Sequence, residues 1–169
     1  MKIEEAINTA IEYEKRIMNV YRDALAKAKD EDGKRIFGVL AKEESYHVKY
    51  LVDRLAEWKE NGTINMEELK TLVPPESKIK EKVEQLEKRM TDKDYSDEIL
   101  MLRKALDVEI QTSEFYERMV DKLEGEHREL FRRFLEIEKG HRALVQAEID
   151  HLEGQGYWFD FPEFDLEIE

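Results

Sequence analysis

The sequence has no cysteine in its 169 residues, and only seven glycines and three prolines. The absence of cysteine excludes disulfides, thiolate nucleophiles, iron–sulfur clusters and cysteine-ligated zinc. The scarcity of glycine and proline argues against a loop-rich sandwich or barrel and favours long helices. A chain of this length is sufficient for one domain with a sizeable core.

Long apolar runs are also missing. No stretch approaches the roughly 18 apolar residues that a membrane span requires. The first ten residues, MKIEEAINTA, carry acids where an export signal would be apolar. We therefore expect a cytoplasmic protein with no membrane partner. The formal net charge of -13 also disfavours nucleic acid as a partner, because the phosphate backbone repels an acidic surface.

Four long amphipathic segments account for most of the chain. Their apolar residues recur at three- and four-residue steps, which is the period of a helix with one buried face. The segments end at the break 30–33, the turn Asn61-Gly62, Gly125 and Gly154. Short breaks after the first and third segments indicate two antiparallel helix hairpins. We predict an all-α fold, a ferritin-like four-helix bundle in which a long crossover joins the two hairpins.

The connection between the hairpins runs from Asn61 to about Ser96 and contains a further helical pattern, Ile79–Met90. A connection this long can span the bundle, so that the second hairpin starts at the far end. After Gly154 the composition changes to aromatic residues interspersed with acids. We expect residues 1–154 to form the bundle. Residues 155–169 should form a tail that docks on the bundle or on a partner subunit, because exposed aromatic residues are sticky.

Charged residues interrupt the apolar stripe of every long segment. The first and third stripes each contain one such Glu, and the second and fourth each contain a Glu followed three residues later by a His. These residues are Glu14, Glu44, His47, Glu109, Glu138 and His141. Each should point inward, where a carboxylate is costly unless it is paired, protonated or bound to a cation. The hairpins also form an internal repeat, in which Glu14 aligns with Glu109 and Glu44 with Glu138.

The interrupting residues share one depth in the predicted bundle. Residues at equal distances from the turn of an antiparallel hairpin face one another. Residue 29, midway between Glu14 and Glu44, lies beside the first turn. The position midway between Glu109 and Glu138 lies beside the turn at Gly125. The four carboxylates and two imidazoles can therefore converge.

The spacing Glu-x-x-His is weak evidence by itself, because each of the four histidines has a Glu three residues earlier. Position along the hairpin separates the pairs. Glu124 and His127 straddle a turn, and Glu148 and His151 would need a turn inside the fourth helix. We expect His127 to be a surface residue at a helix start and His151 to be a surface or dimer-contact residue.

Four carboxylates and two imidazoles suit a pair of divalent first-row ions. Two such ions carry a charge of +4, which neutralises the four carboxylates. Glu44 and Glu138 are placed to bridge the ions, with one histidine on each ion. Glu14 and Glu109 then serve as terminal or semi-bridging ligands. A single imidazole per ion with oxygen ligands favours iron or manganese over zinc.

This arrangement resembles the ferritin-like di-iron carboxylate superfamily, and most closely its rubrerythrin-type branch, over residues 2–154. The resemblance implies a dinuclear iron site, with manganese as an alternative metal, on Glu14, Glu44, His47, Glu109, Glu138 and His141. It also implies that Tyr21 and Tyr116 lie behind the ligands and orient their carboxylates. Core packing with a hydrogen bond is the alternative interpretation of these tyrosines.

The sequence departs from typical rubrerythrins at two points. It has no cysteine for a rubredoxin-like domain, and Thr112 stands where rubrerythrins have an extra Glu. The six-ligand set is therefore nearer to the bacterioferritin pattern, and an enzyme of this kind needs an external electron-donor protein.

The resemblance implies reduction of peroxide or O2 at the iron site, as in protection against oxidative stress. A non-enzymatic protein that binds, stores or transfers iron remains the alternative, and a helical structural domain is a third. We expect a homo-oligomer, with a dimer as the first expectation.

Overall fold

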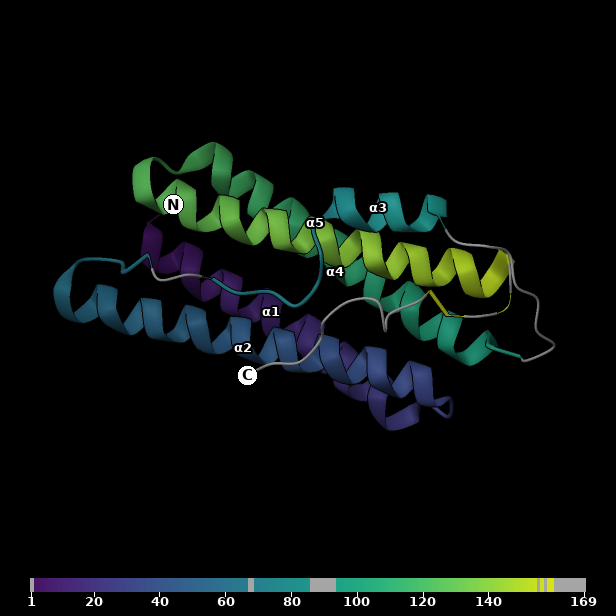
Figure 1. Cartoon of the computed structure of the whole chain (residues 1–169). Coiled ribbons are helices and arrows are strands. Elements are labelled where there is room, and N and C mark those ends of the chain that lie inside the picture. Colours follow the sequence, from purple (N-terminus) through teal and green to yellow (C-terminus); the bar gives the residue numbers. More distant parts are fainter. Residues whose placement is uncertain (1, 67–68, 86–93, 155, 157, 160–169) are drawn as a thin grey trace.

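Five helices make up the regular structure of the part of the chain that is described. The computed structural model describes residues 2–66, 69–85, 94–154, 156 and 158–159. Its helices are α1 (Ile3–Lys27), α2 (Glu31–Asn61), α3 (Glu76–Gln85), α4 (Ser96–Lys122) and α5 (Gly125–Gly154). The four long helices form a bundle, and the short α3 lies against α5 (Figure 1). The predicted all-α, ferritin-like bundle is confirmed.

Local signals in the sequence set the helix ends. The Asp30 carboxylate accepts hydrogen bonds from the backbone N–H groups of Asp32 at 2.9 Å and Gly33 at 3.4 Å. These bonds satisfy amides that the start of α2 would otherwise leave unpaired. Gly62 ends α2 with a left-handed φ of 67°, which glycine adopts without steric cost. The first break, predicted at residues 30–33, lies at residues 28–30, because Glu31 already begins α2. The end predicted at Asn61-Gly62 is confirmed.

The extra helix of the crossover begins earlier than predicted. The pattern predicted Ile79–Met90, whereas α3 begins at Glu76. The carbonyl of Pro75 accepts hydrogen bonds from the N–H groups of Lys78 and Ile79, so the helix starts directly after the proline pair. Residues 86–90 of the predicted helix lie outside the described residues.

The crossover, residues 62–95, determines how the two hairpins are placed. Helix α1 packs against α2 and α4, and α4 packs against α5. Helix α4 begins at the end of the bundle opposite to the end of α2 (Figure 1). On its way the crossover contacts both α2 and α5. Thr71 hydrogen-bonds Glu43 of α2, and a Cβ atom at Gly140 of α5 would lie only 2.8 Å from the Pro74 oxygen.

The buried apolar residues form two clusters. One includes Ile17, Leu40, Leu102 and Leu144, and the other includes Ile11, Leu51, Phe115 and Phe134. On each long helix a buried polar segment lies between the residues of the two clusters. The polar layer is therefore enclosed by apolar side chains toward both ends of the bundle, which exclude water from it.

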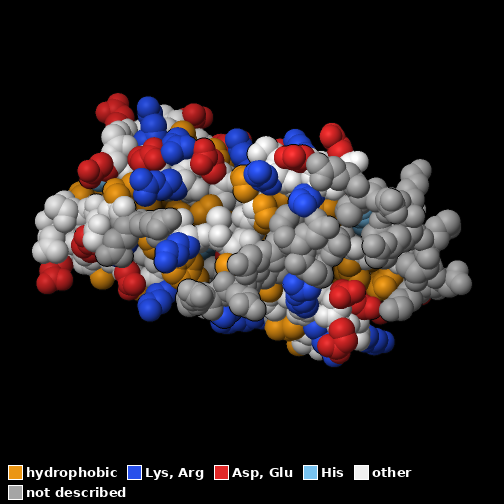
Figure 2. All heavy atoms as spheres, viewed as in Figure 1, with side chains coloured by type: hydrophobic (Ala, Val, Ile, Leu, Met, Phe, Trp, Pro, Cys, Tyr) orange, Lys and Arg blue, Asp and Glu red, His pale blue; other side chains and the backbone are white. Residues whose placement is uncertain are grey.

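The outer surface carries charges of both signs. Figure 2 shows acidic and basic side chains interspersed on one face of the molecule. Arg132, for example, pairs with Glu129 at 2.7 Å and with Glu136 at 2.6 Å along α5. In the described ranges, none of the helices has both the length and the apolar composition needed to cross a bilayer.

Two aromatic residues after α5 pack onto the bundle. Trp158 and Phe159 are 6% and 2% exposed. The Trp158 ring meets the rings of Phe37 and Tyr95 edge-on, with centroids 6.0 Å away in each case. Residues 160–169 lie outside the described residues, so the docking expected of the tail as a whole stays a prediction.

Candidate metal centre

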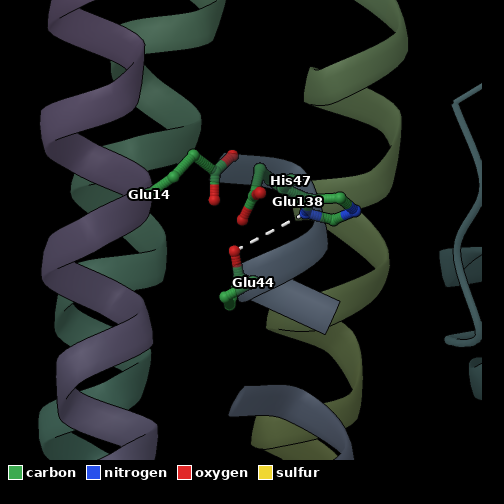
Figure 3. Close-up of side chains that lie close together, drawn as sticks. All are labelled: Glu14, Glu44, His47 and Glu138. Atoms are coloured by element: carbon green, nitrogen blue, oxygen red, sulfur yellow. Dashed lines mark ion pairs between the residues drawn. The ribbon is translucent and has the colours of Figure 1, made fainter. Parts of the chain in front are cut away.

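The structure brings the six sequence-predicted residues into one cluster in the middle of the bundle. Two overlapping groups contain them: Glu14, Glu44, His47 and Glu138, and Glu44, Glu109, Glu138 and His141. Within each group, one potential ligand atom per residue lies within 4.8 Å of all the others. All six side chains have 0% exposure. In Figure 3 the residues of the first group extend from α1, α2 and α5 toward a common point.

Glu44 and Glu138 are the two residues common to both groups. A carboxylate has two oxygens, so a residue that belongs to both groups can contact two ions at once. Glu14 and Glu109 each belong to one group, as do the two histidines. The bridging roles expected of Glu44 and Glu138, and the terminal roles expected of Glu14 and Glu109, stay predictions that this division allows.

Two tyrosines support the cluster from behind. Tyr21 donates a hydrogen bond to Glu109 Oε1, and Tyr116 donates one to Glu14 Oε1, both at 2.6 Å. Each tyrosine thus contacts a carboxylate of the other hairpin, with the symmetry that the internal repeat implies. Burial raises the pKa of both phenols, and the nearby glutamates raise it further. The tyrosines therefore remain protonated donors.

Several buried polar atoms of the cluster have no hydrogen-bond partner among the described residues. They are Glu14 Oε2, Glu109 Oε2, both carboxylate oxygens of Glu44 and Glu138, both ring nitrogens of His47, and Nδ1 of His141. Buried polar atoms are normally paired, because an unpaired one costs about 1–3 kcal/mol. Each of the six side chains thus offers at least one unpaired ligand atom, and Glu44 and Glu138 each offer two oxygens. This donor set fits two divalent cations.

The electrostatics of the cluster favour a bound cation. Burial raises the pKa of Glu14 and of Glu138 well above the usual value, and neighbouring carboxylates raise both further. Burial likewise raises the pKa of Glu44. For Glu109, burial acts in the same direction, but its contact with the Glu138 side chain and the charge of His141 lower its pKa. A divalent cation competes with the protons that the crowded carboxylates retain. Its affinity is therefore expected to decrease as the pH is lowered.

The two histidines lie side by side but have different surroundings. Their rings stack with centroids 5.7 Å apart. His141 Nδ1 lies 2.8 Å from Glu44 Oε1, and His47 Nδ1 lies 3.5 Å from Glu44 Oε2. Burial lowers the pKa of His47. Burial acts in the same direction on His141, but the surrounding carboxylates, first among them Glu43, raise its pKa well above the usual value.

Glu43 is a buried carboxylate that the sequence pattern did not single out. It is 2% exposed, and its Oε1 lies 2.7 Å from His141 Nε2. Thr71 donates to the same oxygen, and the Leu72 N–H donates to Oε2 at 3.1 Å. Burial alone would raise the pKa of Glu43, but the charge of His141 and these bonds lower it to about 2. The available signal was a Glu one helical turn before His47.

The expectation that His151 lies on the surface is wrong. His151 is 4% exposed and Glu148 is fully buried. Phe159 packs against the His151 ring with centroids 5.4 Å apart, so the segment that follows α5 covers the last turns of the helix. Neither Glu148 nor His151 belongs to a ligand cluster within the part of the chain that the structure describes.

His127 and Thr112 also lie outside the ligand set. His127 stands in the first turn of α5, as expected, but it is half-buried, and its ring meets Trp58 edge-on at 5.2 Å. Thr112 is buried, and its hydroxyl donates to the Val108 carbonyl at 2.8 Å. The position where rubrerythrins have an extra Glu therefore holds a short hydroxyl that is satisfied by its own helix.

A pocket of about 460 Å³ lies beside the cluster, between the crossover and α5. Its lining includes Thr71, which bonds Glu43, and Ile137 and Gly140, the residues that directly precede Glu138 and His141 in the chain. Most of the remaining lining is apolar, with Arg133 and Glu136 as its charged members. The pocket therefore approaches the cluster from the side that the crossover covers.

Comparison with known proteins agrees with this geometry. The family model described as Rubrerythrin matches residues 5–149, a span that contains all six clustered residues and both supporting tyrosines. No curated protein and no solved structure matches the chain significantly. The match extends over most of the chain and over all four long helices, and the chain belongs to the rubrerythrin family.

Proposed function

We propose that this protein is an oxidoreductase that reduces peroxide, or O2, with two iron ions held by the buried cluster. The observation that carries the proposal is the set of unpaired ligand atoms. It comprises one oxygen each from Glu14 and Glu109, both oxygens from Glu44 and Glu138, both ring nitrogens of His47 and one of His141. When bound, two ferrous ions supply the two electrons that, with two protons, reduce one hydrogen peroxide to two waters.

The protein's own residues position the ligands and balance their charge. Tyr21 and Tyr116 each hold one oxygen of a terminal carboxylate at 2.6 Å, which leaves the other oxygen free to bind a cation. The four glutamates neutralise two divalent ions, so the loaded site carries no net charge in an apolar interior. Manganese suits the same oxygen-rich set, and iron is proposed because its redox chemistry matches the family.

Access and electron supply complete the proposal. Hydrogen peroxide is small enough to enter the pocket of about 460 Å³ beside the cluster, whose lining includes Ile137 and Gly140, the chain neighbours of Glu138 and His141. Since the sequence has no cysteine, the reducing electrons come from a separate donor protein. The protein works as a homo-oligomer, with a dimer as the simplest form.

Anaerobic loading with ferrous iron tests the proposal. We expect mass spectrometry to find two irons per chain, and stopped-flow absorbance to show one peroxide consumed for every two irons oxidised. Glu138→Ala is the control, since it removes a bridging ligand and should abolish the reaction.

Two outcomes would contradict this function. Iron that is bound but oxidised no faster than free ferrous ion would point to a binding or transfer protein. A large shell that accumulates many irons per chain would point to storage.

A further inference from the structure

The internal repeat matches the metal-ligand candidates of the two hairpins but not the residues behind them. Glu44 and His47 of α2 correspond to Glu138 and His141 of α5. By the same alignment Glu43, the residue before Glu44, corresponds to Ile137. One hairpin therefore contributes a buried carboxylate where the other contributes an apolar side chain. The pseudo-symmetry of the site is broken at this position.

Glu43 supports one histidine much more closely than the other. Its Oε1 lies 2.7 Å from His141 Nε2, within hydrogen-bond distance, and 3.9 Å from His47 Nε2, beyond it. His47 Nε2 makes no hydrogen bond of normal geometry within the described ranges. The backbone of Lys70 lies near this ring, but it is neutral, whereas Glu43 carries a charge.

The crossover fixes Glu43 in this position. Thr71 donates a hydrogen bond to Oε1, the oxygen that faces His141, and the Leu72 N–H donates to Oε2 at 3.1 Å. With both oxygens engaged, the carboxylate cannot turn from His141 to His47 without losing bonds. Pro74 packs directly against Gly140, the residue before His141. The segment of the crossover that holds Glu43 therefore also contacts α5.

The remaining supports of the cluster are matched. Tyr21 and Tyr116 make equal hydrogen bonds of 2.6 Å to Glu109 and Glu14. The two histidines both direct Nδ1 toward Glu44. Glu43 is therefore the charged support that distinguishes the two halves of the site.

A carboxylate behind an imidazole fixes its tautomer and orientation and raises the basicity of the nitrogen that binds the metal. Loss of such a partner typically weakens metal affinity by about 10- to 100-fold. We propose that Glu43 is a positioning residue that makes the two metal positions unequal. The position formed by Glu44, Glu109, Glu138 and His141 takes the first ion, and the position with His47 takes the second ion more weakly. This proposal rests on the two-ion site of the proposed function, but not on its redox chemistry.

Titration with Co²⁺, a divalent ion that is stable in air, tests the inequality. We expect isothermal calorimetry of the intact chain to resolve two steps of different affinity. In Glu43→Gln, which keeps the shape and removes the charge, the tighter step should weaken about 10- to 100-fold, and the weaker step should change much less. The visible spectrum of the first Co²⁺ equivalent should shift in this variant, while the spectrum added by the second should not.

One further variant serves as a matched control, and another tests the support of Glu43 in a second way. Glu148→Gln also removes a buried carboxyl group of this chain, but outside the cluster, and it should leave both steps unchanged. Thr71→Val removes the hydroxyl that donates to Glu43 Oε1 and leaves the Leu72 N–H that donates to Oε2. It should weaken the tighter step by a smaller factor, and it serves as the test if Glu43→Gln does not fold.

The possible failures are distinguishable. Two equal steps in the wild-type protein, or equal weakening of both steps in Glu43→Gln, would overturn the inference and leave the two-ion site intact. An unchanged tighter step in Glu43→Gln would do the same. Binding of fewer than two ions by the wild-type protein would instead overturn the proposed function.

Discussion

Helix α5 carries two Glu-x-x-His pairs, Glu138/His141 and Glu148/His151, that share the same spacing and nearly the same burial. Exposure is 0% for the first three of these residues and 4% for His151. The pairs differ in what the other helices bring to them. Carboxylates from α1, α2 and α4 surround the first pair, whereas Phe159 covers the second. Convergence of separate helices, and not spacing, distinguishes a metal centre from a buried pair.

The two buried glutamates reduce the cost of burial in different ways. Burial raises the pKa of both Glu138 and Glu148 well above the usual value. At Glu148 the backbone of Phe159 partly offsets burial, and the distant charge of Asp32 adds to it. Glu148 therefore favours its neutral, protonated form. Glu138 stands among three further carboxylates, where a divalent cation can replace the protons.

The largest expected effect is on metal content, which should differ between a variant of Glu138 and a variant of Glu148. Glu138→Ala removes a bridging carboxylate, so binding of two ions per chain should be lost. Glu148→Ala should still bind two ions, because no described ligand group includes it. Mass spectrometry of both variants after loading with ferrous iron measures the difference. Uptake of two ions by Glu138→Ala would refute the assigned role of Glu138.

A smaller effect on metal binding is expected from Tyr21 and Tyr116, which hydrogen-bond carboxylates of the cluster around Glu138 and His141. Tyr116→Phe removes the hydrogen bond to Glu14 and retains the packed ring. Metal affinity, measured by competition with a chelator, should fall about 10-fold, the lower end of the range for such supports. Tyr21→Phe should have a similar effect, by the symmetry of the site.

The partly exposed Tyr46, 37% accessible, provides the control for the tyrosine variants. Tyr46→Phe removes a hydroxyl that makes no hydrogen bond to the clustered carboxylates among the described residues. Its chelator competition curve should coincide with that of the wild-type protein. An unchanged affinity in Tyr116→Phe and Tyr21→Phe would show that these tyrosines act through packing alone. An equal loss in all three variants would show that the loss does not come from the hydrogen bonds to Glu14 and Glu109.

The smallest effect concerns stability and its pH dependence. Burial raises the folded-state pKa of Glu148 well above its ordinary value of 4.5. Its contribution to stability is therefore fully present below pH 4.5 and is lost as the pH rises toward the folded-state pKa. In that window the wild-type protein should lose about 1.4 kcal/mol per pH unit relative to Glu148→Gln, which does not titrate.

Urea unfolding of the metal-free wild type and Glu148→Gln between pH 4 and pH 8 measures this difference. We expect the variant to be the more stable protein at pH 8, with the advantage disappearing near pH 4. A difference that stays constant over this range would mean that Glu148 keeps its ordinary pKa in the folded protein.

The clustered residues could be predicted because their placement depends on local rules. A helix turns about 100° per residue, so an interruption of an apolar stripe points to the same side as the stripe. In a tight hairpin, the number of residues between a side chain and the turn then sets the level of that side chain along the bundle. Glu14 and Glu44 meet for this reason, as do Glu109 and Glu138. The exchange of tyrosines between hairpins follows from the repeat, once the hairpins pack against each other.

Glu43 and His151 could not be placed in this way, because their surroundings come from distant parts of the chain. Glu43 contacts His141 of α5 and the backbone of Leu72 in the crossover, and the stretch around Leu72 has no periodic pattern from which its path could be predicted. His151 is buried by Phe159, which follows the helix. The helices, their buried faces and the depth of the six clustered residues follow from local periodicity, so the order of the amino acids is enough to predict them. Which segments cover the histidines depends on packing between residues far apart in the chain, so it emerges only from the three-dimensional fold.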